Sequence, residues 1–246
     1  MRSCLSPVYG LILLLVLSLS CNRDDDPPER VNKLRGVGIR ADSPVVSGAA
    51  VVGLEIVALL PSERNISLSE AYLDEETPEA LRLTMTLNED GNLSSYGALS
   101  LYRQTGTVSV PAPTAAISEA MNGVVRFRYG VRLRADDGKE EVMLGDVLSV
   151  AADSEALGWT AHQLTLDSPD EGNGRQAPLA LKASLTKSVD EPVKLFWYVS
   201  SGTIKSPVAP ETEWRDAAPG EQTLLLAIYP KKSRFFQWEI RRITIL

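Results

Sequence analysis

Imidazoles and thiols are the side chains whose ordinary pKa values lie nearest neutral pH, and this chain has few of them. It carries two cysteines, Cys4 and Cys21, and one histidine, His162. A single histidine cannot build a multi-histidine metal site. The sequence also has no Gly-x-Ser-x-Gly elbow, no glycine-rich phosphate loop and no Cys-x-x-Cys pair. We therefore expect no catalytic residue, no metal site and no cofactor.

Cys21 stands at the end of a segment that predicts export. Arg2 supplies an early positive charge, residues 8–19 are almost wholly apolar, and a serine leads into the cysteine. A charged start, about a dozen apolar residues and a small-residue exit describe a secretory signal. The apolar run is shorter than the roughly 20 residues that a membrane-spanning helix needs. Removing residues 1–20 would leave Cys21 as a lone thiol in an oxidising compartment, with no partner in the chain.

This segment resembles the signal of bacterial lipoproteins, in which a cysteine at the cleavage point is lipidated and becomes the new N-terminus. That family usually has leucine three residues before the cysteine; here Ser18 stands there, and Ser20 fits the pattern. The resemblance implies a palmitate-type lipid on Cys21 and anchoring in the bacterial outer membrane, at the periplasmic face or the cell surface. Ordinary signal cleavage with an incidental free cysteine is the alternative. Residues 21–33 are charged and contain prolines, which predicts a disordered tether.

Composition limits the class of partner and of fold. Without residues 1–20 the chain keeps 24 Lys+Arg (25 less Arg2) against 32 Asp+Glu, a formal charge of −8. That balance argues against nucleic acid and anionic lipid as general partners. Fifteen prolines and seventeen glycines punctuate short apolar runs, which indicates many turns and few long helices. We predict an all-β protein with two β-sandwich (Ig-like) domains, one over 34–155 with long loop insertions and one over 160–246.

The clearest pattern is a strict alternation between residues 124 and 135. One set of side chains is apolar: Val125, Phe127, Tyr129, Val131 and Leu133. The alternate positions include four arginines: Arg126, Arg128, Arg132 and Arg134. Alternation with period 2 predicts a half-buried strand. The arginine row could bind anions, but exposed rows of this kind are more often solvated faces paired with neighbouring acids.

A second strand is predicted to fold back on this one around Asp137-Gly138, a favoured two-residue hairpin turn. That turn would pair Leu133 with Val142 and set Arg134 opposite Glu141. Elsewhere in the N-terminal part the patterns predict further elements: strands over 34–41, 50–60, 81–87 and 107–110, a long loop over 61–79, a weakly patterned stretch over 93–106, and a helix over 114–121 capped by Thr114. The oxygen-rich stretch 167–174 is expected to be a plain loop, with calcium as the weaker alternative.

The stretch 193–200 carries a second resemblance. Its alternation places Trp197 on a core-facing side. It is followed by a glycine turn, a second tryptophan at Trp214, and Pro219-Gly220 leading into an apolar strand. This order resembles immunoglobulin-like or PKD-like β-sandwich domains of bacterial surface proteins. The resemblance covers roughly 176–246 and extends more loosely to 34–150, without the disulfide of antibody domains.

Three aromatic residues are candidate ligand-binding side chains. Phe196 and Tyr198 point away from Trp197, and with Trp214 they could stack on sugar rings or anchor a protein partner. Burial beneath a neighbouring sheet is the alternative. The basic run 231–234, flanked by aromatics, would suit a membrane headgroup surface if it were more than a solvated turn.

Together these features predict a non-enzymatic, lipid-anchored envelope protein that works by non-covalent binding, display or assembly. Its partner would be an envelope protein or polysaccharide. A glycan-binding module and an envelope hydrolase with two converging carboxylates are the alternatives.

Overall fold

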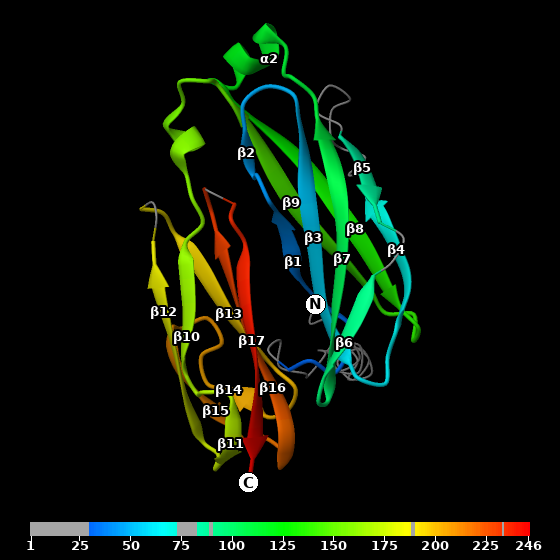
Figure 1. Ribbon diagram of the computed structural model, residues 1–246, viewed down its shortest axis with the longest axis vertical. Coiled ribbons are helices and arrows are strands. Elements are labelled where there is room, and N and C mark those ends of the chain that lie inside the picture. Colours follow the sequence, from blue (N-terminus) through cyan, green and yellow to red (C-terminus); the bar gives the residue numbers. More distant parts are fainter. Residues whose placement is uncertain (1–29, 73–82, 89–90, 188–189, 233) are drawn as a thin grey trace, which may run out of the picture.

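The computed structural model describes residues 30–72, 83–88, 91–187, 190–232 and 234–246. Over these residues the chain is nearly all β and forms two β-sandwiches (Figure 1). The predicted fold class, all-β with two sandwich domains, is confirmed. The predicted export segment, Cys21 and residues 22–29 lie outside the described residues. No helix among the described residues is both long and apolar enough to cross a membrane.

The first sandwich, in the upper part of Figure 1, contains β1 to β9. One of its sheets has the order β1-β3-β7-β5, with β6 also pairing β7, and the other has the order β2-β9-β8-β4. Only the β2–β9 pair is parallel. The elements are β1 (Arg35–Ala41), β2 (Val45–Val46), β3 (Ala50–Pro61), β4 (Ile66–Tyr72), β5 (Thr84–Leu87), β6 (Asn92–Tyr96), β7 (Leu99–Val110), α2 (Ala115–Ala120), β8 (Val124–Ala135) and β9 (Glu140–Val150).

The second sandwich contains β10 to β17 and follows a short 3-10 turn, η2 (Glu155–Gly158). Its sheets have the orders β10-β12-β15-β14 and β11-β17-β16-β13, and only the β11–β17 pair is parallel. The strands are β10 (Gln163–Ser168), β11 (Gly172–Arg175), β12 (Leu179–Thr186), β13 (Val193–Val199), β14 (Thr203–Ile204), β15 (Glu211–Arg215), β16 (Gly220–Pro230) and β17 (Gln237–Ile245).

Both sandwiches have the same topology. In each, one sheet places the first strand beside the second long strand (β1-β3 and β10-β12). The other sheet places a short strand parallel to the last one (β2 on β9 and β11 on β17). The immunoglobulin fold divides its strands in this way, with the first, second, fourth and fifth in one sheet and the remainder in the other. The resemblance of the C-terminal segment to Ig-like sandwiches is therefore confirmed, and the N-terminal part repeats the same order.

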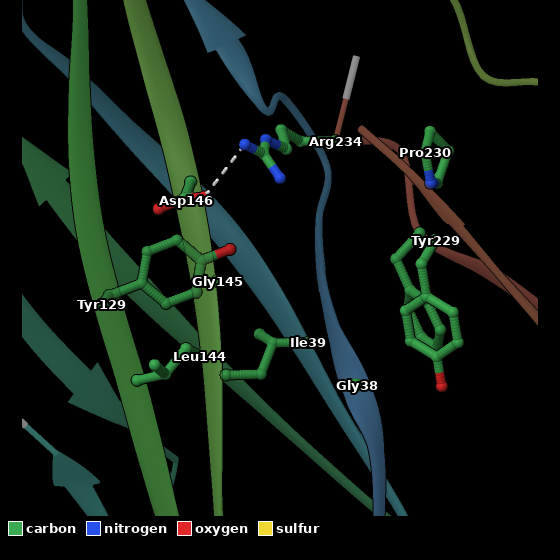
Figure 2. A pocket seen from close by; sticks show the side chains of 10 residues that line it. Gly38, Ile39, Tyr129, Leu144, Gly145, Asp146, Tyr229, Pro230 and Arg234 are labelled. Carbon is green, nitrogen blue, oxygen red and sulfur yellow. Dashed lines mark ion pairs between the residues drawn. The ribbon is translucent and has the colours of Figure 1, made fainter. Parts of the chain in front are cut away.

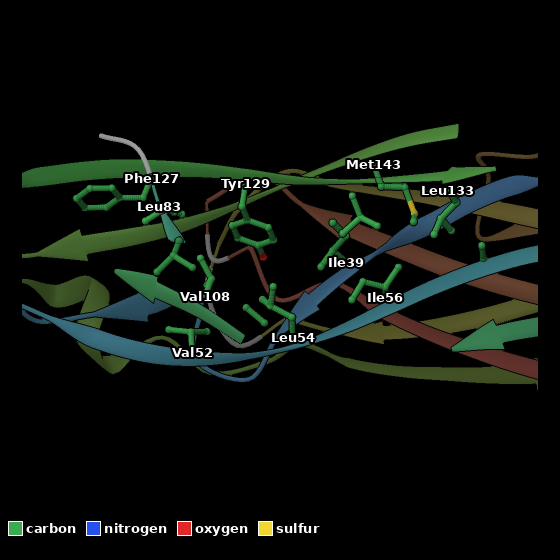
Figure 3. Packing of buried hydrophobic residues seen from close by; sticks show 14 of the residues in the cluster. Ile39, Val52, Leu54, Ile56, Leu83, Val108, Phe127, Tyr129, Leu133 and Met143 are labelled. Atoms are coloured by element: carbon green, nitrogen blue, oxygen red, sulfur yellow. The ribbon is translucent and has the colours of Figure 1, made fainter. Parts of the chain in front are cut away.

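Alternating apolar residues build the core of each sandwich. In the first, Leu54 and Ile56 of β3 lie across from Phe127 and Leu133 of β8, and all four are buried (Figure 3). In the second, Trp197 of β13 is fully buried among the apolar residues of both sheets, as its alternation predicts.

The β8–β9 hairpin is shifted by one residue from the predicted register. Leu133 lies opposite Glu141, and Arg134 lies opposite Glu140. The loop holds three residues, 136–138, because the Ala135 amide bonds the Lys139 carbonyl at 2.8 Å. Its last residue, Gly138, has φ +80°. A type I turn followed by a left-handed residue is the usual three-residue hairpin loop.

This shift exchanges the two faces of β9. Met143 is buried in the core, while Leu144 lies on the arginine side and is 54% exposed. Three of the four arginines in the row are paired with acids across the sheet: Arg128 with Asp146, Arg132 with Glu70, and Arg134 with Glu140. A solvated, paired face is therefore the better description of this row.

Three further expectations can be compared with the described residues. The predicted loop over 61–79 is wrong in part because it contains β4, in which Ile66 and Leu68 alternate with serines but Glu70 interrupts the apolar positions. Likewise, the weakly patterned stretch 93–106 holds β6 and most of β7. The helix α2 is confirmed, with Thr114 Oγ1 accepting a hydrogen bond from the Ile117 amide.

Two strands are buried on both faces and define how the sandwiches meet. In β3, Ile56 and Ala58 face the first core, while Val57 and Leu59 face outward, and all are buried. In β16, Leu224 faces the second core and Leu225 faces outward, and both are fully buried. Continuous apolar runs are typical of strands covered on both sides. The β3 and β16 sheets are therefore in contact where the two sandwiches meet.

Candidate functional site

The contact between the two sandwiches has an apolar core of its own. It is formed by nine buried residues: Val31, Val37, Val57, Leu59, Leu99 and Leu101 from the first part of the chain, and Leu225, Ala227 and Phe236 from the second. Half-buried aromatic rings surround it, among them Tyr96, Tyr198, Tyr229 and Trp238. A continuous apolar interface of this kind is expected to hold the sandwiches as one body, in contrast to the polar contacts that permit domain motion.

Polar contacts fix the relative position of the two sandwiches. The Tyr229 hydroxyl donates to the Val37 carbonyl at 2.7 Å, and the Arg103 guanidinium lies 5.3 Å from the ring centre of Trp238. The Val31 amide donates to the Val199 carbonyl at 2.9 Å, next to an isolated parallel bridge between Arg30 and Val199. Arg30 and Val31 are thus hydrogen-bonded to the second sandwich, although they come just before β1 of the first sandwich in the sequence.

The three predicted ligand-binding aromatics do not form one exposed surface. Trp214 is fully buried in the second core, where its Nε1 donates to the Ser201 carbonyl at 2.8 Å. Tyr198 packs against the junction core, and its hydroxyl lies 3.1 Å from that of Tyr229. Phe196 is partly exposed, with its ring centre 4.8 Å from that of Tyr198. Trp214 therefore packs the core, and Phe196 keeps accessible surface.

A recess opens at the edge of this junction, and we call it the junction recess. Its volume is about 140 Å³. The lining residues come from both sandwiches: Gly38, Ile39, Tyr129, Leu144, Gly145 and Asp146 from the first, and Tyr229, Pro230, Arg234 and Phe236 from the second. Figure 2 shows Tyr129 and Asp146 on one side, with Arg234 and Tyr229 across from them. The recess exists only when the two sandwiches are docked.

Strand pairing explains why the first sandwich is open at this place. The short strand β2 pairs with β9 only at Leu148 and Ser149, so among the described strands none is hydrogen-bonded to the earlier part of β9 on that side, although β1 lies beside it. Two glycines let aromatic rings lie against the backbone. A Cβ on Gly145 would lie 2.5 Å from the Tyr129 ring, and one on Gly38 would lie 2.9 Å from the Phe236 ring.

One carboxylate and one guanidinium face each other across the junction recess. Arg234 Nη2 lies 3.6 Å from Asp146 Oδ2, and Arg128 Nε lies 3.8 Å from Asp146 Oδ1. Both separations exceed hydrogen-bonding distance. Among the polar atoms of the described residues, Asp146 Oδ1 and Arg234 Nε are buried and have no hydrogen-bond partner. Both atoms have almost no accessible surface, so neither is exposed to the recess.

A buried pair fixes the turn that carries Arg234. His162 Nε2 lies 2.8 Å from Glu191 Oε1, and both side chains are fully buried. The other oxygen of Glu191 accepts a hydrogen bond from the Lys232 amide, so the β16–β17 turn is tied to the strand entry before β13. The histidine has no route to a substrate because it is sealed from solvent. Its geometric role is to hold the turn.

Burial also perturbs the tyrosines at the junction. Loss of hydration raises the pKa of Tyr129, and the nearby charge of Asp146 raises it further. Loss of hydration is likewise the main cause of the raised pKa of Tyr229, with a smaller contribution from its hydroxyl contact with Tyr198. Burial lowers the pKa of Arg234 from its ordinary value. The hydroxyl groups of Tyr129 and Tyr229 are therefore neutral at physiological pH.

One feature of the sequence could have indicated this site, although the apolar periodicity did not. Gly145 and Asp146 interrupt the apolar residues of β9, and a glycine inside a strand often marks close approach of another group. Arg234 was noted only as part of the basic run 231–234. In the structure Lys231 and Lys232 are exposed, whereas Arg234 turns toward Asp146. Within the described residues no group of three or more histidine, cysteine or acidic side chains gathers to hold a metal ion.

No protein-family model and no curated protein matches this chain. Solved structures with a similar arrangement include the fibronectin(III)-like modules of Clostridium thermocellum CbhA, at 16% identity and TM-score 0.32, covering 84% of this chain and 93% of that one. Three N-terminal domains of the bacteriophage RB49 outer capsid protein Hoc are similar at 10% identity and TM-score 0.29, covering 86% and 59%. The Escherichia coli adhesin FdeC is similar at 11% identity and TM-score 0.26, covering 87% and 64%.

Proposed function

We propose that this chain is a lipid-anchored protein of the bacterial cell envelope, held in the outer membrane through Cys21. Its two sandwiches act by non-covalent binding, display or assembly, with an envelope protein or polysaccharide as partner. The observation that carries the proposal is the position of Cys21, directly after the apolar export stretch and shortly before the folded body. Residues 22–29 could span at most about 29 Å if fully extended, so the anchor would hold the body near the bilayer.

The geometry of the described residues supports a binding role over a catalytic one. The single histidine is sealed against Glu191. The junction recess offers one carboxylate, Asp146, whereas most glycoside hydrolases use two. A rigid pair of sandwiches with a recess at the seam suits a module that presents or binds another molecule.

The test is mass spectrometry of the mature N-terminus, combined with membrane fractionation. We expect a diacylated Cys21 in the wild-type protein and loss of both acylation and membrane association in Cys21→Ser. The matched control is Cys4→Ser, which lies in the segment to be removed and should leave the mature product unchanged. A wild-type protein that is soluble and unacylated would contradict the anchor.

A second candidate function, glycan binding, is favoured by the walls of the junction recess. Three aromatic rings, those of Tyr129, Tyr229 and Phe236, line it beside a charged pair. Sugar-binding sites combine apolar ring faces with a few fixed polar groups. The rings that supply this chemistry differ from the Phe196, Tyr198 and Trp214 set predicted from sequence. Phe196 alone among those three remains a candidate for contact at the surface.

A further inference from the structure

The arginine row of β8 and the basic run 231–234 meet across the seam. Asp146 lies opposite Arg128 in the sheet, with its Oδ1 3.8 Å from Arg128 Nε and its Oδ2 3.6 Å from Arg234 Nη2. Arg126 precedes Arg128 by two residues on the same face of β8, which places it about 7 Å along the strand. We call Arg126, Arg128 and Arg234 the arginine cluster, and it belongs to both sandwiches.

The accessible side of the arginine cluster is cationic. The side chain of Arg128 is 46% exposed and that of Arg234 is 25% exposed, whereas the Asp146 side chain between them is only 14% exposed. Arg126 is exposed as well. Unlike the rest of the row, it forms no ion pair with an acid of the described residues. An ion that approaches from solvent therefore meets guanidinium groups before it meets the carboxylate.

The guanidinium groups of the cluster repel one another across the seam. Burial is the main cause of the lowered pKa of Arg234, and the positive charges of Arg126 and Arg128 lower it further. The acids that oppose this shift are Asp146 and Glu191, and the side chain of Glu191 is fully buried. An anion held between Arg126 and Arg234 would relieve the repulsion and would bridge the two sandwiches.

The cluster's charge and shape narrow the chemistry of that anion. A guanidinium group presents parallel N–H donors that match two oxygens of a carboxylate or a phosphate. Three guanidinium groups and one carboxylate leave an excess of two positive charges among the described groups. A phosphate monoester carries about −1.5 to −2 at pH 7, whereas a carboxylate carries a single charge. A phosphate monoester therefore balances the cluster better than a carboxylate does.

An exposed apolar platform lies one row along the same sheet. Leu144 precedes Asp146 by two residues and lies opposite Gly130. A Cβ on Gly130 would lie 2.9 Å from Leu144 Cδ2 and 3.1 Å from Tyr72 Cδ1, so both side chains cover the bare glycine. Leu144 is 54% exposed and Tyr72 is partly exposed. Sugar sites combine apolar surface with a few fixed polar groups, and a ring on this platform would lie beside the cluster.

We propose that the arginine cluster binds the phosphate monoester of a phosphorylated sugar carried by an envelope polysaccharide. Arg126 and Arg234 donate to the phosphate oxygens. Arg128 stays paired with Asp146 and adds its charge, and the sugar ring rests against Leu144. This inference rests on the proposed non-covalent binding function and names its ligand class. It is independent of acylation, because all of these side chains belong to the folded body.

Ligand selectivity of the intact mature chain is the first test. The chain carrying Cys21→Ser is titrated with glucose 6-phosphate, glucose 6-sulfate, glucose and inorganic phosphate by calorimetry and by amide chemical shifts in NMR. We expect glucose 6-phosphate to saturate with a Kd of about 1 mM, and the sulfate ester, which has the same shape and less charge, to bind about fivefold more weakly. Binding should weaken severalfold between about 0.01 M and 0.15 M salt, because the Debye length shortens from about 30 Å to about 8 Å.

Variants then locate the site. Arg126→Gln and Arg234→Gln should each weaken glucose 6-phosphate about tenfold, a loss of about 1.4 kcal/mol, and the chemical-shift changes should lie on both sides of the seam. The matched control is Arg134→Gln, which removes one positive charge from the same face of the same strand, where Glu140 is its partner; it should bind as the wild type does. Leu144→Ser should weaken the sugar phosphate and leave inorganic phosphate unchanged. Thermal melting checks that each variant is folded, and the selectivity series needs none of them.

Several results would overturn the proposal: no saturation by about 10 mM glucose 6-phosphate, equal binding of glucose or of inorganic phosphate, or an equal loss in Arg134→Gln. Tighter binding of a phosphoserine peptide would assign the cluster to a protein partner instead, and preference for phosphatidylglycerol vesicles would assign it to a membrane surface. An unacylated chain that binds the sugar phosphate would sink the anchor alone, whereas an acylated chain that does not bind it would sink this inference alone.

Discussion

The apolar junction can be tested by comparing two neighbouring leucines of β16 that are both fully buried. Leu225 faces the seam between the sandwiches, and Leu224 faces the core of the second sandwich. Truncating a buried leucine to alanine costs about 2–5 kcal/mol, so each variant should lose about 3 kcal/mol of unfolding free energy. For a chain of this size that corresponds to a fall in Tm of roughly 6–12 °C.

The two variants make different predictions if the sandwiches do not dock in solution. Leu225 would then already be exposed, and Leu225→Ala would cost less than about 0.5 kcal/mol, whereas Leu224→Ala would still cost about 3 kcal/mol. Urea denaturation followed by tryptophan fluorescence and by circular dichroism measures both values. A wild-type-like Leu225→Ala beside a destabilised Leu224→Ala would refute the shared core, and with it the junction recess.

Two further predictions concern alkaline pH and one hairpin. Because burial raises the folded-state pKa of Tyr129 and Tyr229 above the ordinary value of 10.0, their neutral forms stabilise the fold fully below about pH 10, and that stability is lost as pH rises further. Tyrosinate absorbance from these two rings should therefore appear only together with unfolding; ionisation near pH 10 in an intact fold would contradict their burial. Gly138→Ala should cost about 1 kcal/mol in urea denaturation because φ is +80° there in open space. The control Gly158→Ala, also in open space but without a positive φ, should be nearly neutral, and equal effects of the two would count against a backbone cause.

Much of the fold follows from local pattern. The alternation in β8 predicts a half-buried strand, and the apolar runs of β3 and β16 predict strands as well. The predicted register of the β8–β9 hairpin was wrong because Asp137-Gly138 suits both two-residue and three-residue loops, and the sequence does not distinguish them. One extra loop residue was enough to move Leu144 outward and Met143 inward.

The candidate site was much harder to predict. Asp146 and Arg234 belong to different sandwiches, and no sequence motif links one to the other. They meet because the outward faces of β3 and β16 are both apolar and cover each other. An apolar run shows that a strand is covered on both sides, but it does not show what covers it. Similarly, the burial of Trp214 followed from the pairing of β15 with β12 and β14, which only the assembled sheet specifies.

The bond between the Val31 amide and the Val199 carbonyl has a mechanical consequence. Force applied to the chain ahead of Val31 would reach the seam first, where the Val31 amide is bonded to the edge strand β13, before it reached β1. The load would be divided between both sandwiches instead of peeling one of them from its end. A chain pulled from this end would therefore resist the force with both sandwiches together.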